Sequence, residues 1–196
     1  MSIQSNKCIV LASRPVGEPG ADNFRLETTS VGPIEEDQIL IKVLYLSLDP
    51  YMRGRMSEAK SYAEPVAIGE VMSAESAGVV IESKSDLYAV GDHVCCRSGW
   101  QEYYVSNAKD PMTYKVDANA VPLSTYLGVC GMPGRTAYFG LQHEGKPQAG
   151  ETLVVSAASG AVGSVVGQIG KKLGLHVVGV AGGAEKCAYV KDELGF

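Results

Sequence analysis

The clearest chemical signal in the sequence is a glycine-rich turn at residues 157–163, which reads AASGAVG. It matches the dinucleotide-binding pattern G-x-G-x-x-G with Ala158 at the first glycine position. Gly160 lets the backbone approach a pyrophosphate closely, and Gly163 lets the following helix pack tightly against the preceding strand. The N–H groups at the amino end of such a helix face the phosphates. The turn therefore indicates a dinucleotide site; the alternative is a tight strand-to-helix turn that binds no ligand.

The end of the next predicted strand bears on which dinucleotide is bound. NAD sites place an acidic residue there, about 20 residues beyond the glycine turn, to bind the ribose 2′-hydroxyl. Residues 181–186 read AGGAEK instead, so glycine stands at the strand tip and Lys186 follows one helical turn later. This pattern favours NADP, with Lys186 as a point charge for the 2′-phosphate. The alternative is Glu185 on the ribose of NAD, with Lys186 as an ordinary solvated lysine.

A second candidate site lies at residues 46–56, which read LSLDPYMRGRM. An apolar strand is expected to end at Pro50 and to deliver Tyr51, Arg53 and Arg55 into a loop. Loops on rigid strands often carry function. The Tyr51 phenol can orient a carbonyl group or pass a proton. The alternative is a tyrosine that only packs beside a proline turn.

Other catalytic patterns are missing from the sequence. The pair Gly170-Lys171 lacks both the earlier glycine and the following Ser or Thr of a P-loop, and Ser159 does not stand in G-x-S-x-G. The histidines are isolated and no Cys/His set has metal-ligand spacing, so no metal site is expected. Cys95 and Cys96 adjoin in a predicted strand, where neighbouring side chains point to opposite faces. One core and one surface cysteine are therefore expected.

The first part of the chain, up to about Val121, is rich in predicted strands. Gly, Pro and Asp clusters separate short alternating or β-branched runs at 38–48, 74–82 and 92–96. This pattern is typical of a small barrel or sandwich.

From about Gly150 the hydrophobic pattern changes to alternating strands and helices. A helix that begins at Pro133 and ends at Gly145 leads into this part. Apolar strands are expected at 151–156 and 176–181, around a helix with Val162, Val165, Ile169 and Leu173 at helical spacing, and a last helix at about 184–194. Strand, helix, strand is the βαβ unit of a parallel sheet covered on both faces.

Composition bounds the remaining possibilities. The 196 residues are 45% hydrophobic and 20% charged, as in ordinary globular proteins. A net charge of −5 argues against a surface for nucleic acid or an anionic membrane. Five scattered cysteines without disulfide spacing fit a reducing cytoplasm, and neither a signal peptide nor a membrane span is expected. Two predicted strands follow Gly150 whereas a dinucleotide domain has about six, so we expect a fragment of a longer protein.

Five stretches together resemble the medium-chain dehydrogenase/reductase superfamily. They are VLASRPVGEP (10–19), YLSLDPYMRGRM (45–56), GVCGMPGRTAYFGL (128–141), ETLVVSAASGAVGSVVGQIGK (151–171) and VVGVAGGAEKC (177–187). Within the superfamily, the chain is similar to the zinc-independent double-bond reductases of the prostaglandin reductase, plant alkenal reductase and bacterial curcumin reductase type. Several long motifs in the same order are far more specific than the glycine turn alone.

The resemblance implies a GroES-like β-barrel domain at 1–125, a connecting helix region at 126–149, and the first βαβα part of an α/β Rossmann domain that binds NADP(H) at 150–196. It implies hydride delivery to the β-carbon of a small-molecule enone or enal. By the family's pattern, Tyr51 is the catalytic residue beside the substrate. The cofactor contacts carried over are Gly160, Ala161, Val162 and Gly163 at the pyrophosphate, Lys186 at the 2′-phosphate, and Met132 and Thr136 at the nicotinamide end.

Zinc-dependent relatives place a cysteine and a Gly-His-Glu sequence in the loops of the barrel. The corresponding stretches here read LSLD at 46–49 and SAE at 73–75, and Cys130 alone cannot replace about three protein ligands. The resemblance therefore implies zinc-independent reduction, and a homodimer for the whole protein. Two alternatives stay open: a quinone oxidoreductase on the same scaffold, and a non-catalytic NADPH-binding module that lacks the second half of the nucleotide domain.

Overall fold

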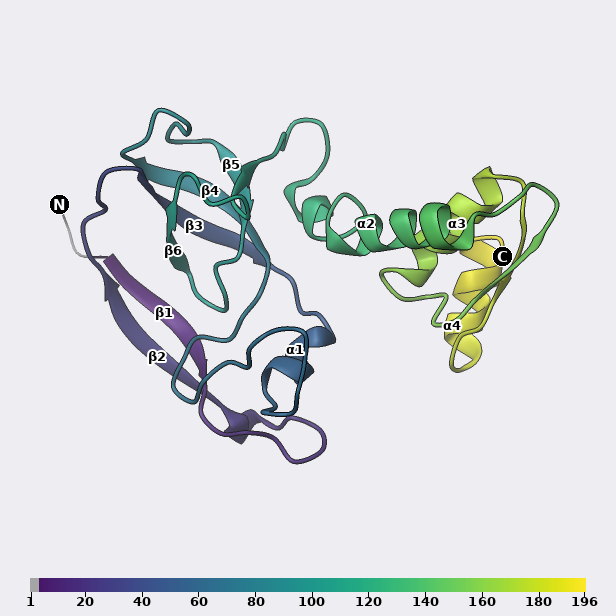
Figure 1. The fold of residues 1–196 in the computed structure, drawn as a ribbon, viewed down its shortest axis with the longest axis horizontal. Coiled ribbons are helices and arrows are strands. Elements are labelled where there is room, and N and C mark those ends of the chain that lie inside the picture. The colour runs from purple at the N-terminus through teal and green to yellow at the C-terminus, as the bar shows by residue number, and fades with distance from the viewer. Residues whose placement is uncertain (1–3) are drawn as a thin grey trace. The chain divides into compact units, whose positions relative to one another are not determined.

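In the computed structural model, which describes residues 4–196, the chain separates into two units after Ser124. The first unit contains strands β1 to β7 and the short helix α1, and the second contains α2 to α4 with strands β8 and β9 (Figure 1). Each unit has its own hydrophobic interior.

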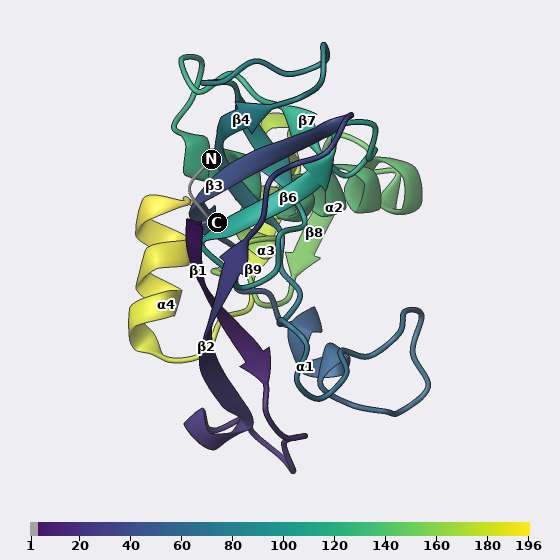
Figure 2. The same ribbon diagram turned by 90° about the vertical axis from the view of Figure 1, so that its left-hand side faces the viewer.

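The first unit consists of an antiparallel ribbon and a five-stranded sheet. β1 (Gln4–Leu11) pairs with β2 (Phe24–Val31) along its whole length, and a 3-10 turn at Ala21–Asn23 precedes β2. The sheet has the order β6-β3-β4-β5-β7, with neighbouring strands antiparallel. Figure 2 shows β3 beside β6, as their pairing requires. Its strands are β3 (Gln38–Leu46), β4 (Ser76–Ser83), β5 (His93–Cys96), β6 (Tyr103–Asn107) and β7 (Tyr114–Lys115).

The pairing of β3 with β4 is irregular, with two register shifts within residues 40–45. Such shifts bend a strand and increase its local twist. Single bridges from Cys8 to Gln101 and from Val10 to Val71 tie β1 to loops beside the sheet. These short, bent, antiparallel strands agree with the barrel-like first part that the sequence predicts.

The interior of the five-stranded sheet is apolar. Its buried members are Ile39, Ile41, Val80, Val94, Cys96 and Ala108. Cys95 is buried as well, so the expectation of one core and one surface cysteine is wrong. Neighbouring side chains in a strand point to opposite faces of the sheet, so one of them is exposed only where one face meets water. Here the side chains of Cys95 and Cys96 are both covered.

The second unit begins with a 3-10 turn at Leu123–Leu127 that spans the boundary between the units. Helix α2 (Met132–Phe139) has Pro133 in its first turn and continues as a π-helical turn, Gly140–Gly145, so the predicted proline start and glycine end are confirmed. The remaining elements are β8 (Thr152–Val155), α3 (Gly163–Lys172), β9 (His176–Gly179), α4 (Ala184–Ala188) and a π-helical turn, Tyr189–Glu193.

Strands β8 and β9 are parallel, with Thr152 opposite His176 and Val155 opposite Gly179, which confirms the predicted βαβ unit. One face of this pair is buried, in a core of Val155, Ala158, Leu175, Val177 and Val190. The alternate side chains, Val154, Val178 and Val180, are exposed. Coverage of both faces, which the sequence predicts, is therefore not seen among the described residues, because α3 and the segment after β9 both pack on the same face.

Within residues 4–196, no helix has the length and apolar character that crossing a bilayer requires.

Candidate functional site

The glycine turn between β8 and α3 is tight, and close contacts between backbone atoms determine its conformation. Ala157 adopts a left-handed conformation with φ 48°, and the N–H of Gly160 donates to its carbonyl at 2.9 Å. A Cβ at Gly163 would stand 2.4 Å from the same carbonyl oxygen. Because real Cβ atoms do not approach a backbone oxygen so closely, only glycine lets α3 begin at this point. The turn therefore brings the amino end of α3 up against the carboxyl end of β8.

The four residues predicted to hold a pyrophosphate occupy consecutive positions at this helix start. Gly160 and Ala161 are exposed, Val162 is the capping residue of α3, and Gly163 is its first residue. Val162 has no side-chain acceptor for the first-turn N–H groups of the helix. The N–H groups of Ser164 and Val165 donate instead to the backbone carbonyls of Gly160 and Val162, and the start of the helix still carries the partial positive charge of its dipole. A Cβ at Gly160 would meet the Ala157 carbonyl oxygen at 3.2 Å. A glycine turn at the start of a helix is the kind of arrangement that binds phosphate groups in other proteins.

The tip of β9 is open. A Cβ at Gly182 or Gly183 would have no atom within 4 Å, and Gly183 takes a positive φ of 82° as α4 begins. Glu185 and Lys186 are both exposed on α4. The strand tip thus carries no acidic side chain, and a cation stands nearby for an anionic ligand group.

The residues predicted at the nicotinamide end share one face of α2. Met132 is half-buried, Thr136 is exposed, and the Thr136 hydroxyl donates to the Met132 sulfur at 3.7 Å. Residues one turn apart are neighbours on a helix surface, so the spacing in the sequence is sufficient to place them together.

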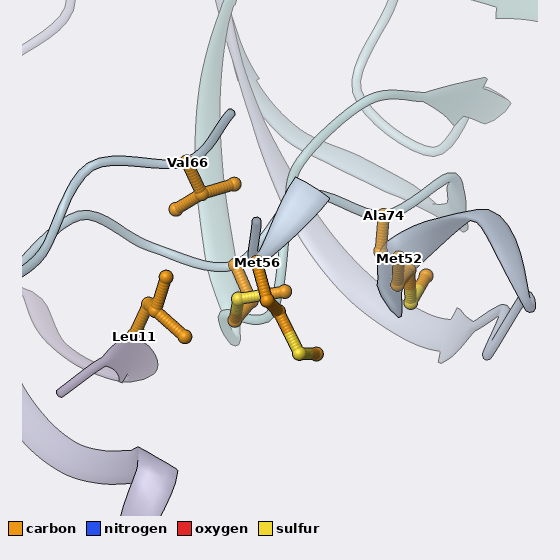
Figure 3. Close-up of a cluster of buried hydrophobic side chains, with 6 residues drawn as sticks. Leu11, Met52, Met56, Val66 and Ala74 are labelled. Atoms are coloured by element: carbon orange, nitrogen blue, oxygen red, sulfur yellow. The ribbon is translucent and has the colours of Figure 1, made fainter. Parts of the chain in front are cut away.

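Tyr51 lies in the first unit and is the first residue of α1 (Tyr51–Arg55), so the expectation of a loop at this point is wrong. Five residues cannot form a stable helix alone. Tertiary contacts hold this one, because Met52 and Met56 are buried in a cluster with Leu11, Val66, Met72 and Ala74 (Figure 3). Tyr51 packs at the edge of this cluster and is half-buried.

Burial raises the pKa of the Tyr51 phenol above its ordinary value of 10.0. The negative charges of Asp49 and Glu75 raise the pKa further, whereas Arg97 opposes them. The phenol is therefore protonated at neutral pH and can donate a hydrogen bond to an acceptor.

Two buried polar atoms of the first unit are not among the site candidates that the sequence predicts. Within the described residues, Asp49 Oδ2 and Ser73 Oγ are buried without a hydrogen-bond partner. Asp49 ends the stretch 46–49 and Ser73 begins the stretch 73–75, the two stretches that correspond to zinc-ligand positions in zinc-dependent relatives. The sequence of these stretches shows that cysteine and histidine are missing, but it does not indicate that polar atoms are buried in them. A buried polar atom without a partner costs stability, so such atoms mark places where a bound group can supply the missing hydrogen bond.

An apolar groove of about 490 Å³ in the first unit is lined by residues of β1, β2, the end of β3 and the segment 100–102. Cys8, Leu26, Leu46, Leu48 and Trp100 are among its lining residues, and Tyr51 is not. Leu46 and Trp100 line the groove and also pack against the buried cluster at whose edge Tyr51 lies. Among residues 4–196, no group of three or more His, Cys, Asp or Glu side chains could hold a metal ion.

Comparison with known proteins gives matches along almost the whole chain. Residues 7–114 match the family model described as the N-terminal domain of oxidoreductase. The NADPH-dependent curcumin reductase of Escherichia coli is 53% identical over 193 residues, covering 98% of this chain and 55% of the relative. The 2-alkenal reductase (NADP(+)-dependent) of Nicotiana tabacum is 40% identical over 196 residues, covering 98% of this chain and 57% of the relative.

A solved structure agrees with these sequence matches. CurA of Vibrio vulnificus in complex with NADPH is 50% identical and superposes with a TM-score of 0.91, over 97% of this chain and 56% of that chain. The chain thus spans about half the length of the relatives that it matches.

Proposed function

The chain belongs to the medium-chain dehydrogenase/reductase family, as a GroES-like domain followed by part of a Rossmann domain, and from that membership we propose that the whole protein reduces the C=C bond of α,β-unsaturated ketones and aldehydes with NADPH. The names of two relatives, curcumin reductase and 2-alkenal reductase, support this substrate class. We further propose that residues 1–125 form the substrate domain, 126–149 a connection and 150–196 the first part of the nucleotide domain.

One observation carries the cofactor assignment: the contact of Gly163 with the Ala157 carbonyl, which fixes the amino end of α3 at the end of β8. In the proposed complex, Ala161, Val162 and Gly163 bind the pyrophosphate through backbone N–H groups. Gly160, whose own N–H donates to the Ala157 carbonyl, lets the backbone approach the pyrophosphate closely. Met132 and Thr136 line the nicotinamide end. Bound NADPH would supply the hydride that adds to the β-carbon of the substrate.

Lys186 is proposed to bind the 2′-phosphate and so to select NADPH over NADH. The open tip of β9 supports this assignment, because Gly182 and Gly183 leave room for a phosphate that an acidic side chain would repel. Glu185 lies beside Lys186 on the same exposed turn, and the alternative assigns it to the ribose of NAD.

Tyr51 is proposed to donate a hydrogen bond to the substrate carbonyl oxygen. Hydride addition at the β-carbon places negative charge on that oxygen, and a donor aimed at developing charge lowers the barrier. The raised pKa keeps Tyr51 in the donating phenol form. The enolate then takes a proton at its α-carbon, so the saturated product gains one hydride and one proton.

We also propose that the whole protein works without zinc, in the cytoplasm and as a homodimer. The residues at 46–49 and 73–75 contain no Cys or His, which supports reduction without a zinc-bound intermediate. The scattered cysteines support a reducing cytoplasm. A homodimer is proposed for the whole protein from its family membership.

Product analysis on the full-length protein tests the proposal. Incubated without oxygen with NADPH and benzylideneacetone, it is expected to form the saturated ketone benzylacetone, as identified by mass spectrometry. Formation of the allylic alcohol would contradict reduction at the C=C bond. Reduction of benzoquinone to hydroquinone with no turnover of the enone would instead support the quinone oxidoreductase. NADPH binding with no turnover of either compound would support the non-catalytic module.

A further inference from the structure

The ring of Tyr62 is held in an exposed position by a buried cation. Tyr62 lies in the loop after α1, and 85% of its surface is exposed. The guanidinium carbon of Arg55 lies 4.5 Å from the centroid of the ring, while Arg55 itself is only 7% exposed. One face of the ring therefore rests on a fixed positive charge, and the rest of the ring is open to solvent.

Hydrogen bonds to backbone carbonyls fasten the segment that carries Tyr62 to α1. Arg55 Nη1 donates to the carbonyl of Ala63 at 2.5 Å, directly beside Tyr62. The N–H of Val66 donates to the carbonyl of Arg55 at 2.8 Å. Arg14 Nη1 donates to the carbonyls of Met56 and Val66, at 3.0 and 3.1 Å, and so closes the loop at both ends. An aromatic ring held in this way loses little conformational entropy when it binds a ligand.

The position of Arg55 places Tyr62 on the same side of α1 as Tyr51. The two residues Tyr51 and Arg55 are four apart in α1, so their side chains lie on the same face of the helix. Tyr62 rests on Arg55 and therefore lies on the side of α1 that carries Tyr51. In agreement, the Tyr62 phenol is among the groups that, after burial and the two carboxylates, raise the pKa of Tyr51.

We propose that Tyr62 is a specificity-determining residue, which stacks its open ring on a planar aryl group conjugated with the enone whose carbonyl Tyr51 binds. This inference rests on the proposed function, since it assumes that the site of Tyr51 binds the substrate. Offset stacking of aromatic rings adds to the simple burial of area, and an alkyl enone offers no ring for it. Arg55 acts as the positioning residue that holds the stacking ring in place.

The test compares two substrates in the full-length protein, benzylideneacetone as the aryl enone and methyl propenyl ketone as the alkyl enone. Tyr62→Ala is expected to lower kcat/KM about tenfold for the aryl enone, mainly through KM, and less than about twofold for the alkyl enone. Tyr62→Phe keeps the ring and is expected to retain the aryl preference. Tyr45→Ala, at an exposed tyrosine of β3, is the matched control and is expected to leave both substrates unchanged.

Three results would overturn the inference. Loss of the aryl preference in Tyr62→Phe would show that the hydroxyl rather than the ring acts. An equal fall for both substrates in Tyr62→Ala would show a structural role, and no fall for the aryl enone would show that Tyr62 does not contact it. If the wild-type protein reduces neither enone, the proposed function itself fails, and that result is distinct from these three.

Discussion

The ring of Phe196 packs directly on Gly167, so closely that a Cβ at position 167 would stand 2.1 Å from the ring atom Cζ. Gly167 lies in the middle of α3, and Phe196 belongs to the segment that returns after α4. The N–H of Phe196 also donates to the carbonyl of Val190 at 3.0 Å. The contact thus fastens the end of this βαβα segment onto the helix that begins at the proposed phosphate site.

Substitution of Gly167 by alanine is expected to weaken this contact. The added methyl group forces the Phe196 ring aside, and overpacking of this kind costs about 1–3 kcal/mol in the free energy of unfolding. Because the ring is the displaced group, the cost of Gly167→Ala should be smaller in a Phe196→Ala background. Urea unfolding of the four proteins of this double-mutant cycle measures the coupling. Equal costs in both backgrounds would contradict the packing described.

Alanine at Gly163 is expected to damage the cofactor site more directly. The methyl group would meet the backbone oxygen of Ala157 at 2.4 Å, and that oxygen cannot rotate away as a side chain can. The start of α3 must then shift, so the Kd for NADPH should rise by more than about tenfold, a cost above about 1.4 kcal/mol. Fluorescence titration of the full-length protein checks this. Gly140→Ala, where the methyl group meets nothing within 4 Å, should bind normally.

Removal of the Lys186 charge is expected to change the choice between the two dinucleotides. Lys186→Ala should raise the Kd for NADPH about 30-fold, or about 2 kcal/mol, because a charged hydrogen bond to the 2′-phosphate is lost. The Kd for NADH, which lacks that phosphate, should stay the same. Calorimetric titration measures both values, with Lys191→Ala as the control at another exposed lysine. An equal effect on both dinucleotides would argue against contact with the phosphate.

Tyr51→Phe removes the proposed donor to the substrate carbonyl while it keeps the ring. We expect kcat for enone reduction to fall about 100-fold, as for loss of one oxyanion donor. The raised pKa of Tyr51 sets the pH dependence: the phenol form persists as pH rises past 10.0, so the Tyr51-dependent part of kcat is lost only in more alkaline solution. A loss of activity in wild type between about pH 7 and 9 that is missing in Tyr51→Phe would contradict this assignment.

The sequence predicts the second unit better than the first. The strand, glycine turn, helix and strand at 151–181 follow from hydrophobic period and from glycine at 160 and 163, which are local signals. The helical state of Tyr51 could not be predicted, because five residues are too few to show a helical period and their contacts with Leu11 and Val66 are distant in sequence. The partners of Arg55 are hidden for the same reason: they lie in a loop whose path depends on tertiary contacts.

Isotope transfer shows whether a hydride passes from NADPH to the β-carbon of the enone. The full-length protein would be given benzylideneacetone and NADPH deuterated on either side of the hydride-donating carbon of the nicotinamide. We predict that one of the two labelled cofactors yields benzylacetone with a single deuterium at the β-carbon, as seen by NMR. Product that carries no deuterium from either cofactor, or carries it at the carbonyl carbon or the α-carbon, would contradict the proposed reaction.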